Sequence, residues 1–484
     1  MPFDTEIDAA DRPLLIDNTW RAGGDGEWLP ILNPVDESVL GRFAVATAAD
    51  LDAALASAQR AFLSWRDVGP LARANVLHAA AALILERADA LARALTREQG
   101  KPLAQARAEI EGCARAFDWA AEEGRRTYGR VIPANTPGLV WTTGRFPVGP
   151  VAAFTPWNFP ASQAAAKIGS AIAAGCSIIL KGPEDAPSGC VGLAQALVDA
   201  GLPSGVFNLV FGRPPEISQR LIMSPIIRKI SFTGSAPVGK HLAGLAAAQM
   251  KPCTMELGGH APVLVFGDVD PVAAARTLVA GKFRNAGQVC ISPTRFMIHE
   301  SIYEPFVEAF VEGAKALVVG NGLDPATEMG PLANDRRLAS VEALVADAVA
   351  AGAVLRTGGE RIGNTGYFYR PTVLTDVPET ARILHDEPFG PLAVLAPFAD
   401  REEAMDRANS TPFGLAAYAF THSQSDAAFV ARRFESGMVG INTFMIGGAE
   451  APFGGIKESG YGREGGMEGI EAYLTTKVVA HMPA

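Results

Sequence analysis

One cysteine of the chain ends a short run of small and polar residues, Asn285-Ala286-Gly287-Gln288-Val289-Cys290. A glutamate, Glu256, ends an apolar segment 290 − 256 = 34 residues earlier, and Cys290 has no Cys or His neighbours at metal-ligand spacing. A thiol assisted by a carboxylate without a metal suggests covalent catalysis at an electrophilic carbon, such as an aldehyde carbonyl. The alternative for these two segments alone is a buried structural cysteine, since free Cys is among the most buried residue types.

The size and composition of the chain indicate a multidomain globular protein. At 484 residues it is longer than a single core supports, so two or three domains are expected. The composition is 48% hydrophobic and 19% charged, which suits packed α/β layers. The net charge of −10 and the absence of a long Lys/Arg run argue against a nucleic acid or an anionic membrane as partner.

Cysteine usage and the N-terminus predict a soluble, cytoplasmic protein. The cysteines are at positions 113, 176, 190, 253 and 290, and no CxxC pair occurs among them, which favours a reducing compartment. The segment Met1-Pro2-Phe3-Asp4-Thr5-Glu6 lacks a signal-peptide pattern, and the apolar windows are too short to span a bilayer.

Alanine-rich segments with helical periodicity alternate with short apolar runs in the first half of the chain. The predicted helices are residues 48–65, 73–98, 104–128, 164–174 and 189–200. The predicted strands are residues 148–155, 177–181, 206–210 and 229–232. These runs are continuous rather than alternating, as in parallel strands buried on both faces. Strand–helix alternation therefore predicts a doubly wound, nucleotide-binding type of domain.

A second alternation after residue 257 predicts a separate α/β domain. Its predicted strands are residues 263–266, 295–299, 373–375, 392–398, 417–421 and 440–442. Before the first domain's strands, residues 130–145 carry alternating apolar residues around Pro and Gly, which predicts a protruding hairpin.

Four further motifs occur in a fixed order with the glutamate and cysteine segments. They are Thr155-Pro156-Trp157-Asn158-Phe159-Pro160, Phe232-Thr233-Gly234-Ser235, Glu387-Pro388-Phe389-Gly390-Pro391 and Pro452-Phe453-Gly454-Gly455-Ile456-Lys457 with Ser459-Gly460. Each motif is weak alone, but six in order are specific. Over residues 14–480 the chain resembles the NAD(P)-dependent aldehyde dehydrogenase superfamily, nearest to the succinate-semialdehyde type.

The resemblance implies an α/β fold with two doubly wound domains and an oligomerisation hairpin. It places an NAD-binding domain at residues 1–127 and 147–256 and a catalytic domain at 257–455. Oligomerisation elements are expected at 128–146 and 465–484, the second with a strand at 472–479. It also implies a homodimer or homotetramer that acts on a small-molecule aldehyde.

The resemblance gives the reactive residues their expected roles. Cys290 is the nucleophile, which forms a thiohemiacetal and then a thioester. Asn158, with the backbone N–H of Cys290, stabilises the oxyanion. Glu256 is the base for thioester hydrolysis, and its apolar neighbours should raise its pKa. Lys167 and Glu464 match residues that assist proton movement, although a purely structural ion pair is equally compatible with the sequence.

The expected cofactor is NAD, with NADP second. The chain has no GxGxxG after the first strand of the nucleotide domain, and Gly234, Ser235 and Gly239 take the place of that motif at a strand–helix junction. By resemblance, Lys181 and Glu184 reach the adenosine ribose, where an acidic residue disfavours a 2′-phosphate.

Three further residues complete the expected cofactor contacts. By resemblance, Glu387 binds the nicotinamide ribose and Phe389 flanks the ring, and Trp157, beside Asn158 in its motif, is also expected to contact the cofactor. A simple turn at Glu387-Pro388 is the structural alternative.

Substrate choice rests on one basic residue. Arg284 matches an arginine that grips a distal carboxylate in succinate-semialdehyde dehydrogenases, and an ordinary wall residue is the alternative. Ala166 stands where that subfamily has a second arginine, and Gly447 and Gly448 replace its carboxylate-binding serine. Succinate semialdehyde itself is therefore not the expected best substrate. A CoA-acylating enzyme and a catalytically silent protein on the same scaffold remain the competing hypotheses.

Overall fold

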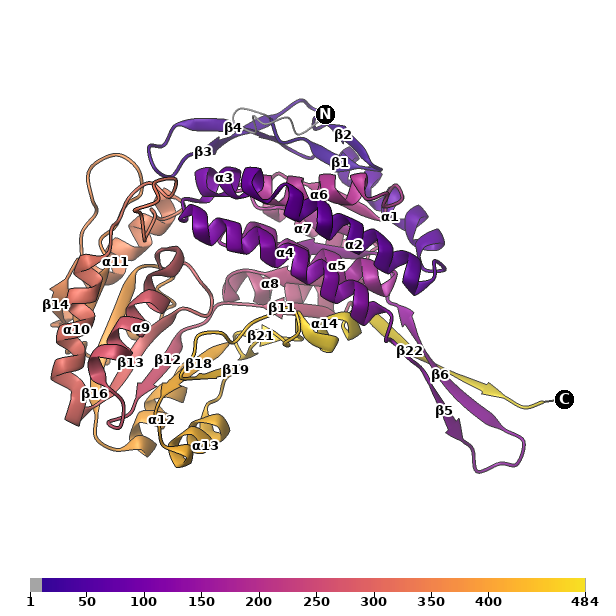
Figure 1. The fold of residues 1–484 in the computed structure, drawn as a ribbon. Coiled ribbons are helices and arrows are strands. Elements are labelled where there is room, and N and C mark those ends of the chain that lie inside the picture. Colours follow the sequence, from indigo (N-terminus) through magenta and orange to yellow (C-terminus); the bar gives the residue numbers. More distant parts are fainter. Residues whose placement is uncertain (1–10, 484) are drawn as a thin grey trace.

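The computed structural model describes residues 11–483, which form two large sheets with helices and a projecting arm (Figure 1). The first sheet has eight strands. In spatial order they are β2 (Thr19–Arg21), β1 (Leu14–Ile16), β9 (Phe207–Val210), β8 (Ile178–Lys181), β7 (Val151–Phe154), β10 (Lys229–Thr233), β11 (Cys253–Glu256) and β21 (Gly460–Tyr461). The five strands from β9 to β11 are parallel, and β1 and β21 extend them antiparallel at the two edges.

Helices cover both faces of this sheet, as expected for parallel strands joined by right-handed crossovers. The helix α5 (Pro160–Ala174) packs on β8, and α6 (Ser188–Asp199) packs on β9. An outer layer of α2 (Pro70–Glu86), α3 (Ala88–Gln99) and α4 (Leu103–Gly124) lies over them. The helices α1 (Ala48–Trp65), α7 (Pro214–Met223) and α8 (Ala236–Ala247) form a separate group on this sheet.

The second sheet has seven strands and its own hydrophobic clusters. In spatial order the strands are β14 (Val354–Thr357), β15 (Thr372–Thr375), β16 (Leu392–Phe398), β13 (Pro293–His299), β12 (Ala261–Val265), β18 (Ala416–Phe420) and β19 (Met438–Ile441). One cluster includes α9 (Pro271–Phe283), α10 (Tyr303–Ala316) and α11 (Asp335–Ala351), and the other includes α12 (Arg401–Asn409) and α13 (Gln424–Arg433).

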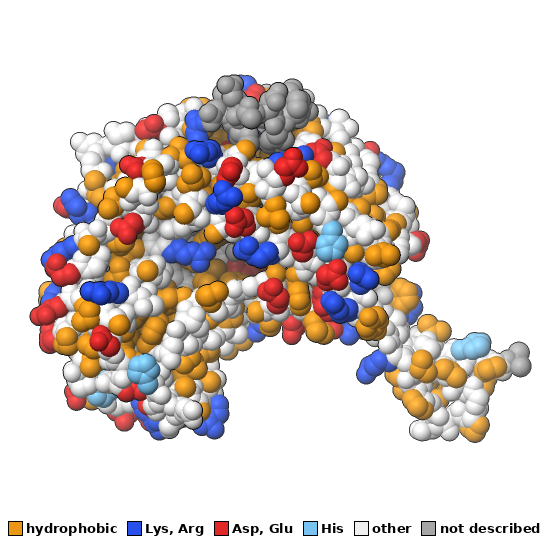
Figure 2. All heavy atoms as spheres, in the orientation of Figure 1, with side chains coloured by type: hydrophobic (Ala, Val, Ile, Leu, Met, Phe, Trp, Pro, Cys, Tyr) orange, Lys and Arg blue, Asp and Glu red, His pale blue; other side chains and the backbone are white. Residues whose placement is uncertain are grey.

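A three-stranded arm projects from the body of the molecule (Figures 1 and 2). The predicted hairpin is confirmed as β5 (Arg130–Pro133) and β6 (Val140–Pro147), and the C-terminal strand β22 (Leu474–His481) pairs with β6. Before β22, the short helix α14 (Gly466–Glu471) packs on α4 and α5. Two small two-stranded sheets pair β3 (Trp28–Leu32) with β4 (Val39–Ala44) and β17 (Phe413–Gly414) with β20 (Ile456–Lys457).

The predicted α/β class with two parallel-sheet layers is confirmed, but one predicted helix is wrong. The segment 73–98 is two helices, α2 and α3, which meet at Arg87 with φ −96° and ψ 6°. The break lets α3 turn so that Leu91 packs on α6 at Gly192, where a side-chain Cβ would lie 2.3 Å from the leucine. The strands within residues 14–44 were not predicted, because they pair with distant partners or with each other over short, mixed-polarity runs.

Two geometrical features of the sheets decide where a site forms. In the first sheet the order of the parallel strands reverses direction between β7 and β10, which is the position where open α/β sheets bind ligands. The carboxyl end of β7 leads directly to residues 155–160, and that of β10 leads to Gly234. No helix within residues 11–483 is long and apolar enough to cross a membrane.

Candidate active site

The loop of residues 284–292, which carries Cys290 and is called the nucleophile loop below, precedes β13 and has a strained backbone. Its 3-10 turn holds Asn285 at φ 50° and Ala286 at φ 54°, a region that non-glycine residues rarely adopt. Hydrogen bonds fix this conformation: Gln105 Oε1 accepts from the Asn285 N–H at 3.0 Å, and Gln288 Nε2 donates to the Asn285 carbonyl at 3.0 Å. Strain held by surrounding contacts is typical of functional loops, and here the loop presents Cys290.

Glu256 and Cys290 lie close enough to alter each other's protonation. Glu256 ends β11 and is buried, and neither of its carboxylate oxygens has a hydrogen-bond partner among residues 11–483. Burial, reinforced by the nearby Glu464 carboxylate, raises the pKa of Glu256 to about 8. Burial and the adjacent Glu256 raise the pKa of the Cys290 thiol well above its usual value. Both groups therefore favour their protonated forms near neutral pH.

Asn158 belongs to the first sheet but contacts the nucleophile loop. Its side-chain Nδ2 donates to the backbone carbonyl of Gln288 at 3.1 Å, two residues before Cys290. An amide nitrogen has two hydrogens, so one remains for another acceptor. The structure thus brings Asn158, Glu256 and Cys290 to one place, as the sequence motifs predict.

Lys167 is fully buried in α5 and forms an ion pair with Glu464. Its Nζ also donates to Thr233 Oγ1 at 2.8 Å and to Ser231 Oγ at 3.2 Å. The lysine lowers the pKa of Glu256, whereas Glu464 raises it. Both residues therefore act on the candidate base through its electrostatic environment, and the ion pair also links α5 to the segment before α14.

The candidate cofactor residues gather at the carboxyl ends of β8 and β10. Lys181 and Glu184 form an ion pair with an Nζ–Oε1 distance of 2.5 Å. Ser235 precedes α8, is exposed, and makes no capping hydrogen bond with its side chain, so its hydroxyl and the helix N-terminus are free to face an anion. Gly239 has a packing role, because a Cβ there would lie 2.2 Å from the Leu257 side chain.

Glu387 and Phe389 extend from the second sheet's domain toward the first. The Glu387 Oε1 atom accepts from the Gly259 N–H at 2.9 Å, and burial raises the pKa of this carboxyl to about 7. Phe389 has a φ of 41° and packs edge-on against Trp157, with ring centroids 5.6 Å apart. The ring contact brings Trp157 next to Phe389, and both are residues expected to contact the cofactor.

Arg284 lies at the entrance to the nucleophile loop and is exposed. Its guanidinium carbon is 5.2 Å from the centroid of the Phe159 ring, and it forms no ion pair with any carboxylate in residues 11–483. Phe444 packs on Tyr418 with ring centroids 4.9 Å apart, so apolar surface lies nearby. An unpaired guanidinium beside aromatic rings suits a ligand with both an apolar body and an anionic group.

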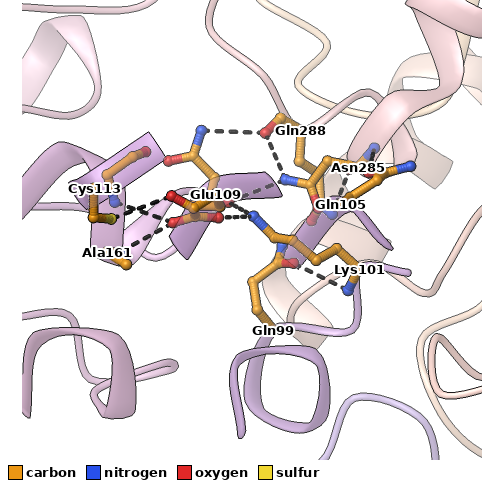
Figure 3. A network of polar contacts seen from close by, with 10 residues as sticks. Gln99, Lys101, Gln105, Glu109, Cys113, Ala161, Asn285 and Gln288 are labelled. Atoms are coloured by element: carbon orange, nitrogen blue, oxygen red, sulfur yellow. Dashed lines mark hydrogen bonds and ion pairs between the residues drawn. The ribbon is translucent and has the colours of Figure 1, made fainter. Parts of the chain in front are cut away.

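Two residues of the same region were missed by sequence reasoning. Lys101 and Glu109 form a buried ion pair with an Nζ–Oε2 distance of 2.6 Å, next to Asn285 and Gln288 (Figure 3). A signal did exist in the sequence: Glu109 lies at the same helical face as the buried Ile110, Cys113 and Ala106 side chains. A charge on the apolar stripe of a helix indicates a buried partner.

The remaining cysteines and His260 have packing roles. All five cysteines are free; Cys113, Cys176 and Cys190 are buried, and Cys253 is half-buried. His260 is buried, with its ring nitrogens 2.6 Å from Thr294 Oγ1 and 3.0 Å from the Ile383 carbonyl, which fixes the start of β12.

Comparison with known proteins identifies the family. The aldehyde dehydrogenase family model matches residues 20–479. The chain is 47% identical to the putative 4-(hydroxymethyl)benzenesulfonate dehydrogenase of Comamonas testosteroni, over 97% of this chain and 98% of that protein. It is 41% identical to the succinate-semialdehyde dehydrogenase (NADP(+)) of Escherichia coli K12, over 96% of this chain and 97% of that protein.

A solved structure supports the same assignment. The succinate-semialdehyde dehydrogenase of Burkholderia pseudomallei superposes with a TM-score of 0.96 and 40% identity, covering 98% of both chains. The family model, the sequence relatives and the solved structure all match nearly the whole chain and all are dehydrogenases or the aldehyde dehydrogenase family. The protein therefore belongs to the aldehyde dehydrogenase family and is an oxidoreductase that acts on aldehydes.

Proposed function

We propose that the chain oxidises an aldehyde to the carboxylic acid through a covalent intermediate on Cys290. The observation that carries the proposal is the meeting of three groups from different elements. Asn158 bonds the Gln288 carbonyl, and the Glu256 carboxyl perturbs the thiol of Cys290. A nucleophile, a base and an amide donor together are the parts that acyl-transfer chemistry needs.

In the first step the Cys290 sulfur attacks the aldehyde carbon, and the thiol proton passes to the ionised form of the Glu256 carboxyl and from there to solvent. Glu256, whose pKa is raised to about 8, is close enough to influence that proton. The carbonyl oxygen becomes an alkoxide, and the free N–H of the Asn158 amide and the Cys290 backbone N–H are the donors we assign to it. The product of this step is a thiohemiacetal.

A nicotinamide bound beside Cys290 would accept the hydride and leave a thioester. In the second step, Glu256 takes a proton from water as that water attacks the thioester carbon. The C–S bond then breaks, the carboxylic acid leaves, and the Cys290 thiol is restored. Base assistance of this kind typically contributes about 10²–10⁴-fold.

We infer that NAD is the preferred nicotinamide cofactor. Lys181 and Glu184 would hold the adenosine ribose, Ser235 the pyrophosphate, and Glu387 the nicotinamide ribose. The Glu184 carboxylate would meet a 2′-phosphate as a like charge. NADP is the second candidate, favoured by the Lys181 ammonium of the same ion pair and by the name of the Escherichia coli relative.

We further propose an aldehyde with an apolar body and one distal anion as substrate. The names of similar proteins specify benzenesulfonate, succinate semialdehyde, 3-sulfolactaldehyde and glutarate semialdehyde, all of which carry a carboxylate or sulfonate. Arg284 is the candidate anion receptor, because its exposed guanidinium has no carboxylate partner in residues 11–483. Ala166 and Gly447 supply no second charge.

The projecting arm is the proposed contact with a second copy of the chain, giving a homodimer or a homotetramer. Its strands expose large apolar side chains, including Val131 at 73% and Val478 at 62%. Hydrophobic patches of this kind favour burial in an assembly. Light scattering of the native chain and of a Val131→Asp/Val478→Asp variant tests the proposal, which predicts a smaller mass for the variant.

The chemistry is tested by product analysis with a panel of straight-chain, aromatic, carboxylated and sulfonated aldehydes. We expect NADH and the free acid to form in equal amounts without CoA. A product that forms only with CoA would instead support an acylating enzyme, against which Glu256 argues. Failure of every aldehyde to reduce either nicotinamide cofactor would contradict the proposal.

A further inference from the structure

A buried ion pair that has no direct access to the reacting atoms lies behind the candidate oxyanion residue. Lys101 follows α3, Glu109 lies on α4, and their side chains are 0% and 1% exposed. Figure 3 shows the two side chains pointing toward one another beside Asn285 and Gln288. Burial of an ion pair is costly, and apolar residues of similar volume would fill the same space at least as well. The pair therefore calls for an explanation other than packing.

Lys101 binds the main chain of the oxyanion residue. Its Nζ donates to the Asn158 carbonyl oxygen at 2.7 Å and lies 3.9 Å from the centroid of the Phe159 ring. The same carbonyl accepts a second hydrogen bond, at 3.1 Å, from Nδ2 of Asn285 in the strained nucleophile loop. One carbonyl thus receives donors from the segment after α3 and from the loop that presents Cys290.

Glu109 binds the chain on the other side of the same residue. Its Oε1 atom accepts from the backbone N–H of Ala161 at 3.0 Å and of Ser162 at 3.2 Å. These N–H groups lie in the first turn of α5, where no intrahelical acceptor is available to them. The ion pair therefore fixes residues 158–162 at two points, one before and one after Pro160.

We propose that Lys101, held by Glu109, is a positioning residue that sets the Asn158 amide for oxyanion stabilisation. This inference rests on the proposed function, since it concerns the same covalent step. The Asn158 amide can move little, because hydrogen bonds hold its backbone carbonyl, its side chain and the first turn of α5 that follows it. Catalytic donors must be placed within a fraction of an ångström, and a misplacement of about 1 Å can cost about 10²-fold in rate.

The experiment uses variants that remove the charges with little change of volume. Because Lys101→Met alone leaves the Glu109 carboxylate buried without its cation, the informative protein is Lys101→Met/Glu109→Gln. The matched control is Glu98→Gln, which alters another buried carboxylate that accepts from the Ser188 N–H at 2.9 Å. Each full-length protein is assayed for the rate of the NADH burst in single turnover, for NAD affinity by calorimetry, and for its melting temperature.

We expect the double variant to lose about 10- to 100-fold in burst rate, as misplaced catalytic groups do. NAD affinity should stay within about twofold, because the ion pair contacts no candidate cofactor residue. The control should keep the native burst rate. A double variant that folds and gives the native burst rate would overturn the proposal.

A second measurement separates positioning from general structural support. In an Asn158→Ala background, removal of Lys101 and Glu109 should cost little more, because the amide through which they act is already gone. Full additivity of the two losses would show that the ion pair acts on some other part of the site and would overturn the proposal. Absence of an NADH burst from the native protein with every aldehyde would contradict the proposed function itself. That outcome is distinct from a native burst rate in the double variant, which would contradict only the positioning role of Lys101 and Glu109.

Discussion

The Asn158 side chain and the Gln288 backbone carbonyl, 3.1 Å apart, join two domains at the candidate active site. Asn158 follows a strand of the first sheet, whereas Gln288 precedes a strand of the second. The carboxyl edge of one sheet therefore meets the amino edge of the other. A small rotation between the domains would separate the proposed oxyanion donor, Asn158, from the proposed nucleophile, Cys290, so the proposed chemistry depends on how the two domains pack.

The first prediction concerns the nucleophile. Cys290→Ala should abolish NADH formation while leaving NAD affinity near the native value, because the proposed cofactor contacts lie on other residues. Steady-state NADH assays and calorimetry with NAD measure the two quantities. Turnover of the variant above the level of a contaminant would refute the assignment of Cys290.

The second prediction separates the two half-reactions. Glu256→Gln should keep the pre-steady-state NADH burst but slow steady-state turnover by about 10²–10⁴-fold, because the attacking water loses its base. Stopped-flow absorbance at the NADH band records both phases. If the burst disappears together with turnover, Glu256 acts earlier, on the Cys290 thiol.

The third prediction is a pH dependence. Since burial raises the pKa of Glu256 to about 8, the carboxyl is mostly protonated at pH 7 and ionises as the pH rises. Where thioester hydrolysis limits turnover, kcat should therefore rise between pH 7 and 9 with an inflection near 8. A flat kcat profile across that range, with a burst still visible, would contradict the assignment of the base.

The raised pKa of Glu256 also has a consequence for stability. The native carboxyl of Glu256 keeps its proton to about pH 8, whereas its ordinary pKa is 4.5, so the folded state binds more protons between these values. The free energy of unfolding must fall as the pH rises through that window, by at most about 1.4 kcal/mol per pH unit. The Glu256→Gln variant has no carboxyl at this position and does not lose this free energy. The melting temperature of the variant minus that of the native protein should therefore increase from pH 5 to pH 8.

Local patterns were sufficient to predict the elements that carry the candidate site residues. The continuous apolar runs of β7 and β8 and the motifs around Asn158 and Glu256 depend on neighbours in the sequence. The ion pair of Lys101 and Glu109 could not be predicted in the same way, because its proposed role depends on the contact of Lys101 with Asn158, 57 positions away, and of Glu109 with Ala161, 52 positions away. The strand β1 was not predicted for the same reason, since its pairing with the distant β9 rather than local propensity stabilises it.

The fourth prediction concerns cofactor choice. The native chain should use NAD with a higher kcat/KM than NADP, and Glu184→Ser should narrow the ratio. The substitution removes the Glu184 carboxylate, which would repel the 2′-phosphate of NADP, and it frees the Lys181 ammonium to pair with that phosphate. Both changes favour NADP. Kinetics with the two cofactors at saturating aldehyde provide the measurement. Equal efficiencies in the native chain would refute the preference.

The fifth prediction concerns the substrate. With Arg284 as the single basic residue of the proposed anion site, the native chain should prefer aldehydes with a larger apolar or aromatic body and one distal anion over the short succinate semialdehyde. Arg284→Met should lower kcat/KM for a 4-carboxylated or 4-sulfonated benzaldehyde and leave benzaldehyde itself nearly unchanged. A charge-assisted hydrogen bond of this type is worth roughly 1.5–3 kcal/mol, about 10- to 150-fold in kcat/KM. An equal decrease in kcat/KM for the charged and uncharged aldehydes would show that Arg284 only lines the pocket and does not bind the substrate anion.

The converse change should move specificity toward the short carboxylated substrate. A Cβ at Gly447 would lie 3.4 Å from Phe453, an ordinary contact, and Ala166 is half-buried on α5. The variant Ala166→Arg/Gly447→Ser tests this change. We expect this variant to gain kcat/KM for succinate semialdehyde and to lose it for hexanal, whose tail would meet an uncompensated guanidinium. If the native chain already prefers succinate semialdehyde strongly over every neutral and aromatic aldehyde, groups other than Arg284 bind the carboxylate and the proposed anion site is wrong.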